Sequence, residues 1–290
     1  MTAARRIHVL HHTEYRYSAP VSQSWQLAHL RPRELPGQRV RMHRLGIEPR
    51  PDWLEPRTDS FGNQATVFAI HAAHAALDVV AESQVEVLPP PPDTEAAWRP
   101  WDAPAEADPG SVPELAHYLA ASPQIPRSRR ALRYARRSFR PGAPFVEALA
   151  SLAHRIHRDF GFDATATTVS TPLDEVFRHR RGVCQDFARV MIAGLRGLGV
   201  PARYQSGYIV TRPPPGRPKL VGADASHAWV SAWCPGQGWI DIDPTNDRRC
   251  DQDFVTLGWG RDFSDVTPLR GVILGGGIQT LEARVTVTPD

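Results

Sequence analysis

Residues 5 to 88 alternate apolar and polar side chains with the period of two that is typical of β-strands. Proline or glycine turns separate the strand-like stretches from one another. These stretches are 7–18, 24–32, 38–49, 63–70 and 77–88. We therefore expect residues 1–88 to form an N-terminal β-rich module.

Helical periodicity replaces this alternation further along the chain. Residues 89–110 are rich in proline, alanine and glutamate, which predicts a linker or an extended strap. Helices are expected at 114–121, 127–140 and 145–159, followed by a further helix and a second sheet. The apolar stripe of the third helix consists of Phe145, Leu149, Leu152, Ala153 and Ile156. Residues 111–290 should thus combine a helical block with a helix-and-sheet core, which makes the chain an α+β protein.

The helix that follows carries a cysteine, Cys184, in its first turn. Gly199 and Pro201 are expected to end this helix. Its apolar positions are Val183, Phe187, Val190, Met191, Leu195 and Leu198. The free amides and the positive end of the helix dipole favour a thiolate at Cys184, and the same amides can hold an oxyanion. The alternative is that Cys184 is a buried small hydrophobic residue.

The two residues after the cysteine are polar. Gln185 is a candidate to assist the oxyanion or to bind substrate. Asp186 is expected to stabilise the helix N-terminus. Because its carboxylate slightly opposes thiolate formation, activation of the thiol must come mainly from an imidazole and the amides.

A strand pair downstream offers that imidazole. Residues 226–234 alternate as a strand, 235–238 form a turn and 239–243 return. One face of the first strand carries His227 together with Trp229, Ser231 and Trp233. Trp229 is therefore a candidate to line an acyl-binding groove, whereas the other tryptophans are expected to pack.

The register of this hairpin decides which aspartate meets His227. Direct pairing of Cys234 with Trp239 turns His227 away from both candidates. An odd turn, through a bulge or a glycine-containing three-residue loop, places Asp243 diagonally next to His227, about 7 Å away between backbones. Asp241 is then one pair too far and is expected to be a solvated strand residue. The competing interpretation of Asp243 is a cap for the turn that follows it.

These segments carry a resemblance. RGVCQDFA, SHAWV and GWIDIDPTND, in this order, resemble the core of the bacterial transglutaminase-like family, within the papain-like group of cysteine acyl-transfer enzymes. HHTEYRYSAPV, LRPR and DSFGN are similar to the β-rich N-terminal region of that family. The tail GRDFSDVTPLRGVILGGGIQTLEARVTV is similar to its C-terminal segment.

The resemblance implies Cys184 as nucleophile, His227 as base and Asp243 as orienting carboxylate. It also implies a papain- or transglutaminase-like core, in which the nucleophile helix packs on an antiparallel sheet. It implies no particular substrate, because the family includes transamidating, peptide-hydrolysing and inactive members. No cofactor and no metal are expected.

Composition fits a compact protein. The 290 residues, 41% of them hydrophobic, suffice to bury a large core. The N-terminal segment has no uninterrupted apolar run, and no later stretch approaches a membrane span. The three cysteines fall in no CxxC pair. We expect a cytoplasmic protein with reduced thiols and no membrane partner.

The charge is mildly basic, at a formal +3. Lys219 is the only lysine, so arginine supplies the other 33 of the 34 basic residues, which indicates a compositional bias. Arginines are densest at 127–140, where Arg129, Arg133, Arg136 and Arg140 would form one helical stripe. Because no aromatic residues are interleaved with them, we expect a solvated or partner-facing surface rather than a nucleic-acid site.

A zinc site is the alternative use of the cysteines. Cys184, His227, Cys234 and Cys250 are suitable ligand types, but no paired knuckle anchors them and Cys234 should point away from the His227 face. The loop 212–225 is the expected lid over the site.

Taken together, the sequence predicts a cysteine-dependent acyl-transfer enzyme that acts on peptide or glutamine-type amide bonds through a thioester, by hydrolysis or transamidation. Its expected partner is a protein or peptide substrate. The alternative is a catalytically silent peptide- or protein-binding module. Arylamine-type acetyl transfer is a third hypothesis, but it calls for a coenzyme A site for which the sequence gives no signal.

Overall fold

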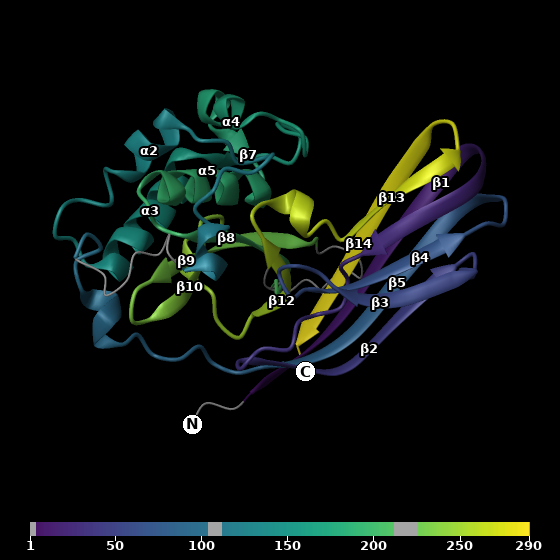
Figure 1. Cartoon of the computed structure of the whole chain (residues 1–290), viewed down its shortest axis with the longest axis horizontal. Helices are drawn as coiled ribbons and strands as arrows, with labels where there is room; N and C mark the ends of the chain where they lie inside the picture. Colours follow the sequence, from purple (N-terminus) through teal and green to yellow (C-terminus); the bar gives the residue numbers. More distant parts are fainter. Residues whose placement is uncertain (1–3, 104–111, 212–224, 290) are drawn as a thin grey trace, which may run out of the picture.

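A computed structural model describes residues 4–103, 112–211 and 225–289. Figure 1 shows its two parts side by side, a large curled sheet and a smaller sheet covered by helices. The mixture of helices and antiparallel strands agrees with the predicted α+β class. Within the described residues, no helix is both long enough and apolar enough to cross a membrane.

The large sheet is antiparallel and has seven strands. They are β1 (Arg5–Ala28), β2 (Gln38–Glu48), β3 (Trp53–Thr58), β4 (Gln64–Ile70), β5 (His74–Val87), β13 (Leu269–Gly275) and β14 (Gln279–Pro289). The order is β2-β5-β1-β4-β3, and β13 and β14 also pair with β1. The predicted strands 7–18 and 24–32 are one long strand. Strand β3 was not predicted, because its proline and charged residues are tolerated only at a sheet edge.

Both ends of the chain build this sheet. The first half of β1 lies between β5 and β14, as at Thr13, which faces Val79 and Ala283. The second half lies between β4 and β13, as at Trp25, which faces Ala69 and Val272. The C-terminal segment therefore lies in the β-rich sheet, whereas the sequence predicted it as part of 111–290.

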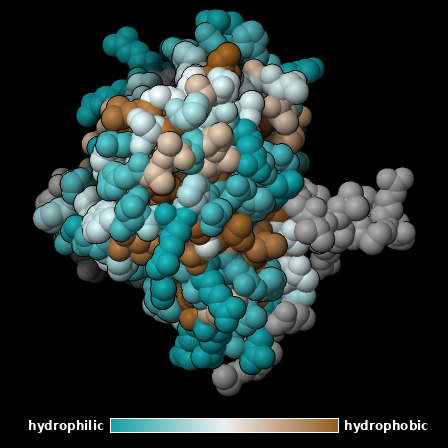
Figure 2. Space-filling model, turned by 90° about the vertical axis from the view of Figure 1, so that its right-hand side faces the viewer, coloured by the Kyte–Doolittle hydropathy of each residue, from teal (hydrophilic) through white to brown (hydrophobic). Residues whose placement is uncertain are grey.

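Apolar side chains remain exposed on the large sheet. Figure 2 shows this side of the molecule, where apolar patches are separated by polar side chains. The exposed apolar residues of β1, β13 and β14 are Trp25, Val272, Leu274 and Leu281.

The smaller sheet has the order β11-β10-β9-β8-β12 and is antiparallel throughout. Its strands are β8 (Ala202–Ile209), β9 (His227–Cys234), β10 (Gly238–Asp243), β11 (Arg248–Arg249) and β12 (Phe254–Gly260). A short parallel pair, β6 (Gly161–Phe162) and β7 (Arg181–Gly182), lies outside this sheet. The helices that accompany it are α1 (Pro113–Ala116), α2 (Arg129–Ala135), α3 (Phe145–Asp159), α4 (Leu173–His179) and α5 (Cys184–Gly197), with short 3-10 turns η1 (Glu95–Trp98) and η3 (Phe263–Asp265).

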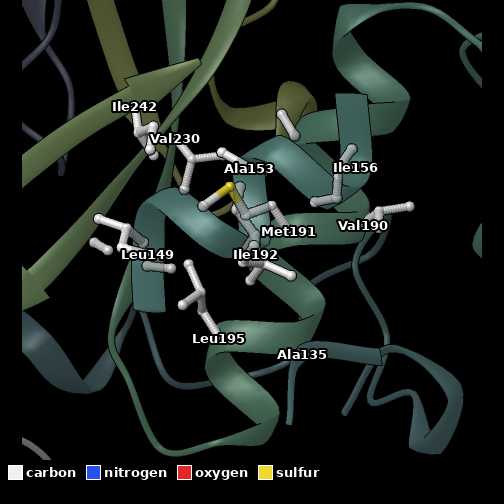
Figure 3. Packing of buried hydrophobic residues seen from close by; sticks show 14 of the residues in the cluster. Ala135, Leu149, Ala153, Ile156, Val190, Met191, Ile192, Leu195, Val230 and Ile242 are labelled. Carbon is white, nitrogen blue, oxygen red and sulfur yellow. The ribbon is translucent and has the colours of Figure 1, made fainter. Parts of the chain in front are cut away.

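The main core lies between α3, α5 and the smaller sheet. Figure 3 shows Leu149 and Ile156 of α3 beside Met191 and Leu195 of α5, with Val230 from β9 close by. The predicted stripe of α3 is wholly buried, and its helix has the predicted bounds. This packing fixes the start of α5 against the strand that carries His227.

Helix α2 packs tightly on the second half of α5. A Cβ at Gly194 would lie 2.8 Å from the Ala135 Cβ, so glycine is required for this approach. Helix α2 ends at Ala135, earlier than predicted. The predicted arginine stripe therefore does not extend to Arg140 on one helix. Helix α4 was not predicted.

The two parts of the molecule share a small apolar interface. Val9 and Val85 of the large sheet join Tyr208 and Val255 of the smaller one in a single buried cluster. The described part of the predicted strap, 89–103, packs along the helices and the smaller sheet: Ala97 is fully buried and Asp93 pairs with Arg249. The sheet module is thus docked on the core that holds the candidate site.

Candidate active site

The nucleophile candidate begins a helix whose first turn is fixed by one carboxylate. Asp186 Oδ2 accepts hydrogen bonds from the Val183 backbone amide at 3.0 Å and from the Thr167 hydroxyl at 2.7 Å. A Cβ at Gly182 would lie 2.5 Å from the same oxygen, so only glycine leaves room for it. The expectation that Asp186 stabilises the helix N-terminus is confirmed, and Cys184 is held half-buried at the start of α5.

The amides next to the thiol are available to a ligand. The first hydrogen bonds within α5 run from the Asp186 and Phe187 amides to the Val183 carbonyl, at 2.9 and 3.2 Å. The amides of Cys184 and Gln185 precede these donors and therefore have no hydrogen-bond acceptor within the helix. Together with the helix dipole they favour negative charge at this end.

The hairpin of β9 and β10 has the odd register that the site requires. Gly238 pairs with Cys234, so a three-residue loop, 235–237, joins the strands. Gly236 and Gly238 have φ values of 80° and 93°, which explains why glycine occupies both positions. Ser231 faces Asp241, so Asp243 is placed diagonally next to His227, as predicted.

Asp243 holds the imidazole and caps the following turn at the same time. Its Oδ2 lies 2.7 Å from His227 Nε2, which is hydrogen-bond distance. Its Oδ1 accepts from the Thr245 amide at 2.8 Å, and Asn246 Nδ2 donates to Oδ2 at 2.6 Å. Asp243 therefore both contacts His227 and caps the turn, and its role as the orienting carboxylate stays a prediction.

Asp241 has other partners. It accepts from the Ser231 hydroxyl and, at 3.4 Å, from Gln205 Nε2. Asp241 is thus half-buried and hydrogen-bonded, not the solvated strand residue that was expected. These hydrogen bonds connect it to Ser231 and Gln205 and not to His227.

Electrostatics favour a charged imidazole. Burial lowers the pKa of His227, but hydrogen bonds with Asp243 and Cys184, and the charges of both, outweigh burial and raise the pKa to about 10. Burial raises the pKa of Asp243, and its bonds with His227 and Asn246 reverse this and lower it. Since Nε2 is engaged by Asp243, Nδ1 is the ring nitrogen left for the thiol.

The structure changes the role predicted for Trp229 and leaves that of Gln185 open. Trp229 is fully buried, so it cannot line an open groove. Its ring stacks on that of His227, with 6.2 Å between the ring centroids, and packs edge-on against that of Phe254, with 5.3 Å between the centroids. Trp229 therefore supports the imidazole. Gln185 donates to Gln124 Oε1 at 3.2 Å, and a substrate-binding role for it remains a prediction.

Sequence reasoning missed Asn246 and Phe254. The turn motif that contains Asn246 was noted only as a turn that Asp243 could cap. Phe254 lies on β12, and its ring is 6.2 Å from that of His227. No sequence pattern pairs β12 with this site, because the contact depends on the packing of the sheet.

The other two cysteines do not join the site. Cys234 is buried, with its thiol near the Ala96 carbonyl, and burial raises its pKa to about 11. Burial also raises the pKa of Cys250 well above its usual value. Among the described residues, three possible metal ligands come together only at His12, Glu14 and Asp78, so the predicted alternative zinc set is not assembled. The expected lid falls almost entirely on 212–224, outside the described residues.

Sequence comparisons identify the family. The bacterial transglutaminase-like N-terminal region matches residues 7–86, and the transglutaminase-like superfamily matches residues 133–244. An uncharacterized protein of Mycobacterium tuberculosis is 43% identical over 282 residues, which cover 94% of this chain and 89% of that protein. A protein-glutamine gamma-glutamyltransferase of Pseudomonas aeruginosa is 35% identical over 123 residues, 36% of this chain and 18% of that protein.

The fold has a solved counterpart. A crystal structure from Cytophaga hutchinsonii, of a protein named provisionally as a cysteine protease, matches with a TM-score of 0.80 and 18% identity, covering 99% of this chain and 91% of that one. The fold is therefore shared over nearly the whole chain. The chain belongs to the bacterial transglutaminase-like family, with its N-terminal region and its transglutaminase-like core both present.

Proposed function

We propose that this protein is a cysteine-dependent acyl-transfer enzyme that cleaves carboxamide or peptide bonds through a thioester on Cys184. One observation carries the proposal: the His227 imidazole is bonded to buried Asp243 and to the Cys184 thiol, and its pKa is raised to about 10. Such an imidazole takes the thiol proton and keeps it as a general acid.

In the acylation step, the Cys184 sulfur forms a bond to the carbonyl carbon. The Cys184 amide and a neighbouring amide hold the oxyanion. When the tetrahedral intermediate collapses, the carbon–nitrogen bond breaks and the His227 imidazolium protonates the leaving amine. The products of this step are a thioester and a free amine.

Deacylation reverses the proton transfer. Neutral His227 removes a proton from water or from an acceptor amine, which attacks the thioester and releases the Cys184 thiolate. Water gives hydrolysis and an amine gives transamidation. Hydrolysis is the default for a site that is open to water.

The test measures ammonia released from a glutamine peptide and, with hydroxylamine added, the hydroxamate formed. Cys184→Ala should abolish both products, and the control Cys234→Ala should keep them, because the Cys234 thiol lies outside the site. Iodoacetamide near pH 6 should label Cys184 before Cys234 or Cys250, and His227→Ala should remove this preference. Equal labelling of the three thiols in the folded protein, with no turnover, would instead identify a silent binding module.

A further inference from the structure

A series of connected hollows starts beside the nucleophile helix. The first, of about 720 Å³, lies between segments 123–126 and 168–173. Gln124 lines it, and its side-chain oxygen accepts the hydrogen bond from Gln185. Because Gln185 directly follows Cys184, this bond places the hollow near the start of the helix that carries the candidate thiol.

Shared walls connect the first hollow to two more. The second, of about 390 Å³, has Pro126, Pro172 and Leu173 in common with the first. The third, of about 380 Å³, has Arg130 and Arg133 in common with the second. The three hollows are therefore neighbours, and the row that they form, called the groove below, runs from segments 123–126 and 168–173 to helix α2.

The far end of this groove is strongly basic. Five arginines line the third hollow: Arg130, Arg133, Arg136, Arg137 and Arg180. Arg180 lies 3.6 Å from Asp159, and Arg130 donates to a backbone carbonyl of Phe177. Within the described part of the chain, Arg133, Arg136 and Arg137 are exposed and form no ion pair, although other arginines, such as Arg41 and Arg261, pair with carboxylates.

The near end of the groove is different. Its walls include three prolines, Leu173 and the half-exposed Val169, together with the amide of Gln124 and the hydroxyls of Thr168 and Ser170. The arginine in this wall, Arg189, is buried and paired with Asp186. Apolar walls with a few polar groups suit an extended peptide. The aromatic residues at the basic end, Tyr134 and Phe177, are buried, so they offer no face on which nucleic-acid bases can stack.

We propose that this groove binds the substrate and that its arginine end holds an acidic segment of a peptide or protein, on one side of the amide that reacts at Cys184. Charge complementarity to unpaired arginines selects the acidic segment. Asp174, the one carboxylate among the described residues that line the second hollow, disfavours acidic residues at that midpoint. The position of the reacting amide rests on the proposed function, whereas the binding of an acidic segment does not.

The first test measures binding without catalysis. Fluorescence anisotropy of full-length Cys184→Ala protein should show that labelled hexaglutamate binds more tightly than hexaglutamine and that added salt weakens it. Arg133→Gln combined with Arg137→Gln should weaken hexaglutamate binding by about five-fold. The control combines Arg39→Gln with Arg44→Gln, two exposed arginines on β2, and should stay near the parent value. Equal losses in the two double variants would overturn the proposal, and so would tighter binding of a single-stranded oligonucleotide of the same charge.

The second test asks whether the groove leads to the thiol. Peptides that carry a chloroacetyl group and a glutamate run, separated by spacers of graded length and attached in either order, are incubated with the wild-type chain. Alkylation of Cys184 should be fastest at one order and spacing, and Arg133→Gln with Arg137→Gln should remove the advantage. Val169→Trp, which fills the first hollow, should slow these peptides without slowing iodoacetamide.

The two proposals fail in different ways. Hexaglutamate that binds at the arginines while no spacer accelerates alkylation would show a separate anion site and overturn the groove. Accelerated alkylation in a protein that releases no ammonia would instead contradict the acyl-transfer function and leave the groove intact.

Discussion

Ser231 lies directly opposite Asp241 across the β9–β10 hairpin, and this single pairing decides which carboxylate hydrogen-bonds to the His227 imidazole. With that register, Asp243 is diagonal to His227 and bonds to its Nε2 at 2.7 Å. Asp241 turns to the Ser231 hydroxyl and to Gln205 instead. Two aspartates that are two residues apart thus have different surroundings.

These surroundings predict unequal effects of the same substitution. Asp243→Asn should lower the rate of amide hydrolysis by about 10²–10⁴-fold, because the amide no longer stabilises the imidazolium or fixes its tautomer. Asp241→Asn should leave the rate close to that of the wild type. Steady-state kinetics on variants shown to be folded by circular dichroism measure the difference. A larger loss for Asp241→Asn than for Asp243→Asn would show that the carboxylate was assigned wrongly.

The His227–Asp243 pair also predicts how stability depends on pH. The folded-state pKa of His227, about 10, lies above its ordinary value of 6.5, so its stabilisation is complete below pH 6.5 and is lost as the pH rises through about 10. The pKa of Asp243 is lowered from 3.8, so its contribution is present above pH 3.8 and is lost as the pH falls through the depressed value. His227→Gln should therefore lower the Tm most between about pH 4 and 6.5.

The comparison is made by thermal unfolding at a series of pH values. The Tm difference between the wild type and His227→Gln should shrink as the pH approaches 10. His179→Gln, at an exposed position at the end of α4, is the control and should change the Tm little at any pH. A difference that grows above pH 8 would contradict the direction of the His227 shift.

Gly182 predicts a local steric effect. In Gly182→Ala, the new Cβ would lie 2.5 Å from Asp186 Oδ2, so the carboxylate must leave the Val183 amide that it caps. We expect a loss of roughly 1–3 kcal/mol in the free energy of unfolding, measured in urea. Gly37→Ala is the control, since no atom lies within 4 Å of the added Cβ. Equal stability of the two variants would rule out the close contact at Gly182.

The shared sheet predicts the outcome of limited proteolysis. The proline- and alanine-rich composition of residues 89–110 favours a first cut within that segment. The two fragments should stay together in size-exclusion chromatography and separate only in denaturant, because β13 and β14 pair with β1. Fragments that separate under native conditions would show that the module needs only its N-terminal strands, and a first cut within 184–243 would contradict the expected boundary.

Local patterns in the sequence were sufficient for much of the site. The helical spacing after Val183 placed Cys184 in a first turn, because a helix start depends on nearby residues. Alternation along β9 and β10, together with the requirement that an imidazole and a carboxylate meet, selected the odd register and therefore Asp243. These predictions depended on contacts that are close in sequence or that one hairpin determines.

Other features depend on contacts between distant segments. The tail that contains 279–289 was noted only for its similarity to the family's C-terminal segment, and the sequence did not show that it pairs with β1, because a local pattern does not specify a strand's partner. Trp229 shares a face with His227, as its position predicted, yet Phe254 of β12 packs against it and it lies fully buried rather than in a groove. The sequence by itself determined which residues have the chemistry and the local geometry for acyl transfer. Only the tertiary structure decided which surfaces stay open to a substrate, because exposure depends on what the rest of the chain covers.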